Sequence, residues 1–183
     1  MNEVLKAITE RNSCRDFADK PLTDEQVKAI AAAALAAPSA MNKQPWHVVL
    51  VKDKALVDEL DAEGMRILSA AEDKSAYNRM KDRGGKLLYN APCLVYILSD
   101  GSSYAQIDSG ILCQNVTLAA QSLGLSSCIV GMAGVPLNGP KGDEFKKRMR
   151  FPDGYTFAIG VLVGTPNTSK EPHEADLSKI TYV

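Results

Sequence analysis

Residues 37–46 read APSAMNKQPW, a run of small and polar residues between an alanine-rich segment and an apolar one. The alanine-rich segment is predicted to be a helix that ends before Pro38, because the residue preceding a proline is biased away from the helical conformation. Ser39, Asn42 and Gln44 then place small polar side chains and free backbone amides at the end of a rigid element. Such groups suit the edge of a flat heterocycle, while Trp46 can be read as a core anchor alone.

The helix before this stretch carries clear start signals. Thr23 and Gln26 form a capping box, and Leu22 and Val27 have the spacing of a hydrophobic staple. The helix is predicted to run to about Ala37, and its interior is nearly all alanine. Because small side chains let a neighbouring element approach closely, we expect a buried packing helix.

Apolar spacing predicts the remaining elements. We expect further helices over residues 2–12, 53–64, 104–123 and 143–150, and strands over residues 46–51, 93–99, 126–132, 155–164 and 180–183. The helix at 104–123 is apolar around so much of its circumference that we expect it to be central. Residues 65–86 are polar, and we expect an excursion outside the core. Helices and strands do not alternate strictly, which favours one α+β domain over residues 1–183.

Composition excludes several classes of protein. Of the 183 residues, 45% are hydrophobic and 23% are charged, which is typical of a globular domain and not of a disordered or fibrous chain. The 21 basic and 22 acidic residues give a net charge of −1, so neither nucleic acid nor an acidic membrane surface is expected as a partner. The longest apolar run, 29–37, is too short to span a bilayer.

The four cysteines are widely spaced and form no zinc-binding pattern, so we expect no metal site. A disulfide framework is not expected at this density, which favours a reducing compartment and a soluble cytoplasmic protein. Cys93, Cys113 and Cys128 are interpreted as buried thiols. Cys14 lies beside an arginine, and a reactive thiol is one alternative for it.

The segment 11–17 reads RNSCRDF, in which Arg11, Ser13 and Arg15 alternate directly after a predicted helix. In an extended chain, alternate side chains point to the same side. Two guanidinium groups and a hydroxyl that converge in this way suit a phosphate, because arginine offers forked donors and serine adds one more. A solvated loop is the alternative, and this segment alone favours neither.

Common catalytic and nucleotide-binding motifs are absent. The chain has no G-x-S-x-G elbow, no Walker loop and no G-x-G-x-x-G fingerprint. His47 lies within a predicted strand, where a structural role is favoured over a catalytic one.

Together these segments resemble the nitroreductase family of FMN-dependent flavoproteins. That family's R-R-S-x-R-x-F pattern is similar to residues 11–17, and its A-P-S-x-x-N-x-Q-P-W pattern is matched from Ala37 to Trp46. Further matches, in order along the chain, are Asp108-Ser109-Gly110, Gln114-Asn115, Leu118-Ala119-Ala120, Gly124-Leu125, Ser127 and Gly164-Thr165-Pro166. The resemblance covers nearly the whole chain, but residues 65–86 are not matched.

The resemblance implies roles for particular residues. It implies that the FMN phosphate faces Arg11 and Ser13, that Arg15 lies near the flavin N1/O2 edge, and that Asn12 belongs to the same segment. The loop that borders the flavin from a partner subunit is implied to comprise Pro38, Ser39, Ala40, Met41, Asn42 and Gln44. Backbone donors near N5 and O4 are implied at Ile129, Val130, Gly131 and Met132. Many members carry a basic pair in the tail, where this chain has Lys170 and, three residues later, His173.

The implied fold is a three-layer α+β structure, in which helices flank a central, mostly antiparallel sheet, and the implied assembly is an intertwined homodimer. Residues 165–183 would form a tail or arm, and residues 65–86 could act as a lid. The implied activity passes electrons from NADH or NADPH through FMN to a nitroaromatic, a quinone or a similar flat acceptor by a ping-pong route. No catalytic side chain is implied, since the flavin carries the chemistry. A flavin carrier or sensor without turnover and a specialised relative such as a reductive dehalogenase are the alternatives. The sequence selects neither the acceptor nor the nucleotide.

Overall fold

The centre of the fold is a four-stranded antiparallel sheet with the strand order β1-β2-β4-β3. The computed structural model describes residues 1–172 and 174–183. The strands are β1 (Trp46–Val51), β2 (Cys93–Ser99), β3 (Ser126–Val130) and β4 (Thr156–Gly164). The predicted α+β fold with an antiparallel sheet is therefore confirmed.

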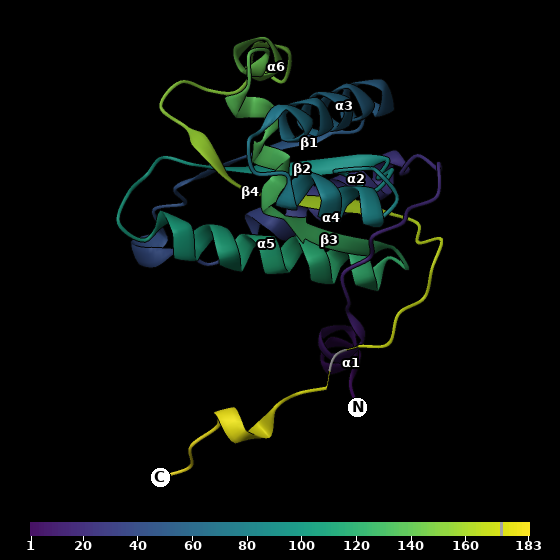
Figure 1. The fold of residues 1–183 in the computed structure, drawn as a ribbon. Coiled ribbons are helices and arrows are strands. Elements are labelled where there is room, and N and C mark those ends of the chain that lie inside the picture. The colour runs from purple at the N-terminus through teal and green to yellow at the C-terminus, as the bar shows by residue number, and fades with distance from the viewer. Residues whose placement is uncertain (173) are drawn as a thin grey trace.

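Helices cover both faces of this sheet (Figure 1). The α-helices are α1 (Glu3–Glu10), α2 (Asp24–Leu35), α3 (Lys54–Ala70), α4 (Ser75–Asp82), α5 (Ala105–Ser122) and α6 (Gly142–Arg148). Figure 1 shows α5 along one face and α3 with α6 on the other. The predicted three-layer arrangement is thus present.

The central strand β2 explains why two separate cores form. Every residue of β2 is buried, and alternate side chains point to opposite faces of the sheet. Val95 and Ile97 pack in the core that includes α2 and α5, whereas Leu94 and Tyr96 pack in the core that includes α3 and α6. The continuous apolar run in the sequence therefore has a structural reason, because both faces of β2 are covered.

The alanine-rich helix α2 begins as predicted and is less buried than expected. The Thr23 hydroxyl accepts the backbone N–H of Gln26, and the Gln26 side chain accepts the backbone N–H of Thr23. Only Ile30 and Ala34 of α2 are buried in the single chain. The expectation of a buried helix is thus wrong within the single chain, and most of the alanines of α2 lie at the surface.

A similar correction applies to α5, which was expected to be central. One side of α5 is fully buried, with Leu112 and Val116 at 0% exposure. The opposite side presents Ile107 at 63% and Ile111 at 36% exposure. This helix therefore covers the sheet and leaves an apolar face without cover within its own chain.

Residues 65–86 include the end of one helix and the whole of another, and most of their side chains lie at the surface, with Met80 docked in the core. Helix α3 continues to Ala70, beyond the predicted end near residue 64, and α4 follows. Met80 in α4 is only 2% exposed and belongs to the core on the α3 side of the sheet.

The two ends of the chain lie outside the main body. Helix α1 has no buried residue, and Figure 1 shows it beyond α5, beside the C-terminal tail. The predicted strand at 180–183 is wrong, because in the part of the chain that the structure describes these residues form neither a strand nor a bridge, and they follow a short turn of 3-10 helix, η4 (Leu177–Lys179). Within the described ranges, no helix is long and apolar enough to cross a membrane.

Candidate functional site

The segment with the alternating arginines is fixed to the edge strand β3. Ser13 forms a parallel bridge with Ser127, and the backbone N–H of Cys14 donates to the Ser127 carbonyl oxygen at 2.9 Å. Phe17 is 1% exposed and anchors the end of the segment in the core. The segment is therefore extended where it meets β3, as its alternating pattern predicts.

Three polar side chains of this segment lie around the Cys128 thiol. Burial raises the pKa of Cys128, and Arg15, Ser13 and Arg11 each oppose this increase, the arginines by their charge and the serine through its hydroxyl. Arg11 also opposes the burial that raises the pKa of Cys113 to about 12. Arg11, Ser13 and Arg15 thus all lie near enough to Cys128 to influence its thiol, in the segment that borders the edge strand β3.

The start of the C-terminal tail is tied to the same segment. The Asn12 side-chain amide donates to the Lys170 carbonyl oxygen at 3.0 Å. The backbone N–H of Asn167 donates to the Asp16 carbonyl oxygen at 3.0 Å. These bonds place the backbone of Lys170 beside the arginine segment. His173, the other predicted residue of the tail, lies outside the described residues.

The loop after α2 has an unusual backbone that is held by a distant carboxylate. Met41, Asn42 and Gln44 have positive φ values of 53°, 53° and 48°, a region that L-residues rarely occupy. Both carboxylate oxygens of Asp108 lie within hydrogen-bonding distance of the Ala40 N–H, at 3.2 and 3.3 Å. Such strain persists only where the surroundings impose it, and it is common at ligand-binding sites.

Polar groups of this loop bond to one another and face outward. The Ser39 hydroxyl accepts the Gln44 backbone N–H at 2.9 Å, and the Gln44 side chain donates to Asn42 at 3.3 Å. Met41 is 74% exposed. Within residues 1–172 and 174–183, no hydrogen bond joins this loop to the arginine segment, so one chain presents them as two separate parts.

The third predicted segment, residues 129–132, begins in β3 and ends in a 3-10 turn, η2 (Gly131–Gly134). The hydroxyl of Tyr96, which is fully buried, donates to the Ala133 carbonyl oxygen at 3.0 Å and thereby anchors η2. Ile129 is 43% exposed on β3. The turn is therefore rigidly held next to the strand that carries the arginine segment.

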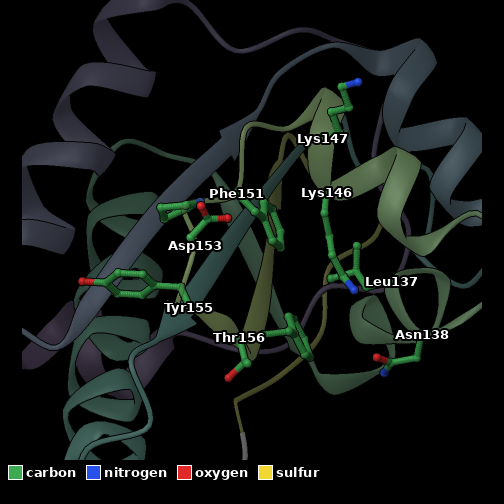
Figure 2. Close-up of a pocket in the computed structure, with 11 residues that line it drawn as sticks. Leu137, Asn138, Lys146, Lys147, Phe151, Asp153, Tyr155 and Thr156 are labelled. Carbon is green, nitrogen blue, oxygen red and sulfur yellow. The ribbon is translucent and has the colours of Figure 1, made fainter.

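The cavities of the single chain coincide only partly with the predicted residues. A cavity of about 490 Å³ lies between α6 and the start of β4, and none of the predicted site residues lines it. Figure 2 shows Lys146 reaching toward Leu137 in this cavity while Lys147 points away. A smaller cavity of about 260 Å³ is lined by Arg15 together with Arg83 and Lys86. Arg83 and Lys86 carry no pattern in the sequence that links them to Arg15, because they lie in a polar segment that is remote from it along the chain.

The sequence leaves alternative roles open for two further residues, Cys14 and His47. Cys14 is 4% exposed, and burial raises the pKa of its thiol, so the structure contradicts a reactive thiol at this position. All four cysteines are free and buried. The His47 ring lies edge-on to the Tyr155 ring, with 5.9 Å between the centroids, which agrees with a structural role.

The chain belongs to the Nitroreductase family, because the model of that family matches residues 8–165. It is similar to a solved nitroreductase with bound FMN from Desulfitobacterium hafniense, with 49% identity, a TM-score of 0.95, and coverage of 100% of this chain and 99% of the other.

Two curated relatives are more distant. The FMN reductase [NAD(P)H] of Bacillus subtilis is 28% identical and is matched over 94% of this chain and 70% of its own length. The NADPH-flavin oxidoreductase of Vibrio harveyi is 28% identical over 93% of this chain and 69% of its own length.

Proposed function

We propose that this protein is an FMN-dependent oxidoreductase that transfers electrons from NADH or NADPH to a nitroaromatic, a quinone or a similar flat acceptor by a ping-pong route. The observation that carries the proposal is the bridge from Ser13 to Ser127, which fixes the segment with Arg11, Ser13 and Arg15 in an extended form along the edge strand β3. The full-length similarity to an FMN-bound nitroreductase from Desulfitobacterium hafniense supports the choice of cofactor. The names of the curated relatives support the choice of nicotinamide donor.

The donor groups of the site fit FMN. Arg11 and Ser13 would bind the terminal phosphate, because two forked N–H donors and a hydroxyl match its oxygens. Asn12 would hold the tail in position through the Lys170 carbonyl, and the Lys170 ammonium group would add a second cation to the phosphate. The rigid turn at residues 129–132 would present backbone N–H groups to the ring edge.

When bound, FMN supplies the redox chemistry by taking a hydride equivalent from the nucleotide and giving electrons to the acceptor. The task of Arg15 is electrostatic, since its permanent positive charge stabilises negative charge at an adjacent ligand edge. We assign no side chain as an acid or a base. The residues of the chain instead bind, orient and polarise the cofactor and the substrates. One face of the bound flavin then serves the electron donor and the electron acceptor in turn.

We infer that the site is completed in a homodimer by the loop at residues 38–44 of a partner subunit. That loop is exposed and separate from the arginine segment in one chain. Ile107 and Ile111 expose an apolar face on α5, and an apolar groove of about 390 Å³ lies between α1, α2 and α5. The projecting α1 and tail add further apolar side chains, including Ile8 and Leu177. A second copy of the chain would cover these surfaces.

Co-expression of two variants tests this shared site. If Arg11 and Asn42 act from different subunits, a heterodimer of Arg11→Ala and Asn42→Ala chains contains one site with both changes and one site with neither. Activity should then return in the mixed protein, although each homodimer is impaired. An absence of any recovery, with heterodimers verified by mass, would contradict a shared site. Sedimentation of the wild-type protein as a monomer would also contradict it.

The four buried free thiols support a location in a reducing compartment, and we infer the cytoplasm.

The primary test of the function is the cofactor itself. Heat should release FMN from the purified protein, and mass spectrometry should identify it. FAD, or a protein that binds no flavin after reconstitution, would contradict the proposal.

A further inference from the structure

A small cavity beside Arg15 is lined by three cationic side chains. Arg15, Arg83 and Lys86 border this space of about 260 Å³, and Asp16 is the acidic residue of the lining. The lining residues alone carry a formal charge of +2, of which Asp61, 4.0 Å from Lys86, offsets a part. Because the walls of a cleft keep part of the solvent away, such a charge attracts anions more strongly than the same charges on a flat surface. We call this space the Arg15 cavity.

A buried carboxylate fixes the wall that faces Arg15. Asp61 in α3 is 4% exposed, and it accepts the backbone N–H of Leu88 at 2.6 Å. The Lys86 ammonium nitrogen lies 4.0 Å from an Asp61 carboxylate oxygen. Burial of a carboxylate is costly unless it is compensated by bonds of this kind. Asp61 thus holds the segment that carries Lys86 at a defined place.

The two walls are also joined to each other. The backbone N–H of Phe17, two residues after Arg15, donates to the Tyr89 carbonyl oxygen at 3.2 Å. Tyr89 and Asn90 have positive φ values of 53° and 62°. Non-glycine residues adopt this conformation only where their surroundings impose it. The cavity is therefore a built feature of the fold rather than a gap between mobile loops.

Two guanidinium groups of the cavity are available to a ligand. Among the ion pairs of residues 1–172 and 174–183, neither Arg15 nor Arg83 takes part in one. Both residues are exposed to solvent. A guanidinium group binds a carboxylate or a phosphate through two parallel N–H donors.

We propose that the Arg15 cavity binds the anionic group, a carboxylate or a phosphate, of a substrate that reacts at the flavin. This inference rests on the proposed function, in which Arg15 lies at the edge of the bound flavin. A substrate with a carboxylate would be held by Arg83 and Lys86 while its flat ring lies against the flavin. The enzyme would thus prefer anionic substrates to neutral ones of the same shape. The anion can belong to the acceptor or to the nucleotide.

The FMN-loaded enzyme tests this with two matched pairs of substrates. With NADH as donor, kcat/KM is measured for 4-nitrobenzoate and for the neutral 4-nitrobenzamide. Separately, the rate of flavin reduction is measured with NADPH and with NADH. In Arg83→Ala, either the nitrobenzoate-to-nitrobenzamide ratio or the NADPH-to-NADH ratio should fall about fivefold, the scale of one partly exposed ion pair. A fall in the first ratio identifies the acceptor as the source of the anion, and a fall in the second identifies the 2′-phosphate that distinguishes NADPH from NADH.

Two variants make the result specific. Arg83→Lys keeps the charge and should restore most of the ratio. Arg79→Ala removes a charge from the exposed surface of α4, outside the lining, and should leave both ratios unchanged. Unchanged ratios in Arg83→Ala would overturn the inference while leaving the proposed function intact, provided that flavin is still reduced. Weaker FMN binding with unchanged ratios would also overturn it, because the cations would then serve the flavin. An enzyme whose flavin is reduced by neither nucleotide would instead contradict the proposed function.

Discussion

The Ala40 backbone N–H donates to the Asp108 carboxylate across 68 residues of chain, at 3.2 and 3.3 Å to the two oxygens. Asp108 is 3% exposed and lies in the first turn of α5. This bond joins the strained loop after α2 to the long helix of the layer beneath the sheet. It explains why the sequence pairs an A-P-S loop with a D-x-G motif far along the chain.

Replacement of Asp108 should disorder this loop. Asp108→Ala leaves the Ala40 N–H without its acceptor, which should lower the free energy of unfolding by about 1–3 kcal/mol and weaken FMN binding. Asp108→Asn keeps one acceptor oxygen and should cost less. Urea unfolding and FMN titration measure both effects, with the exposed Asp153→Asn as control. Wild-type stability and affinity in Asp108→Ala would show that the loop holds its shape without this bond.

Local signals predicted most of the fold. The strands β1 and β2 have the predicted bounds, because their apolar runs are closed by Pro45 and Pro92 and by charged or polar residues. Burial was harder to predict for α2 and α5. An apolar helix surface can be covered by the same chain or by another one, and the sequence of one chain does not distinguish these cases. The packing of Met80 was missed because one buried side chain is enough to dock a polar helix.

The site was predicted as separate segments rather than as a geometry. Alternate spacing identified Arg11, Ser13 and Arg15, and the structure places their segment along the edge strand β3 through the bridge from Ser13 to Ser127. Arg83 and Lys86 line the Arg15 cavity and were missed, because the long-range contacts of Asp61 with Lys86 and Leu88 leave no periodic pattern in the sequence.

Removal of the first arginine should impair cofactor binding directly. Arg11→Ala should weaken FMN binding by roughly 1.5–3 kcal/mol, the usual contribution of a hydrogen bond to a charged group. Titration of the apo-protein with FMN, followed by fluorescence quenching, measures the change. Lys147→Ala removes a charge from exposed α6 and serves as control. Riboflavin, which lacks the phosphate, should bind both wild type and Arg11→Ala equally; a loss for riboflavin as large as for FMN would place Arg11 elsewhere.

The tail lysine offers a second test of the phosphate site. Lys170→Ala should weaken FMN binding and make it less dependent on salt, because one fewer cation then attracts the phosphate. The backbone bond from Asn12 should survive this change, since it uses the Lys170 carbonyl oxygen. If the FMN affinities of the variant and the wild type at low salt differ by less than about 0.5 kcal/mol, the Lys170 side chain does not belong to the site. A change that small is typical of a solvated lysine at the surface.

The thiols should be inert in the folded protein. Burial raises the pKa of Cys93 to about 12 and that of Cys14 in the same direction, so the reactive thiolate is scarce at pH 8. Iodoacetamide labelling followed by peptide mass spectrometry should modify none of the four cysteines until urea unfolds the chain. Rapid labelling of Cys14 alone in the native protein would revive the interpretation of a reactive thiol beside Arg15.

The most direct test of the central claim is anaerobic reduction of the purified, FMN-loaded protein by NADH or NADPH, followed through the flavin absorbance near its visible maximum. We expect bleaching within seconds with at least one nucleotide, recovery when a nitroaromatic or a quinone is added, and parallel lines in double-reciprocal plots. A flavin that stays oxidised with both nucleotides and is reduced by dithionite would contradict the claim, since the protein would then bind flavin without serving as an NAD(P)H oxidoreductase.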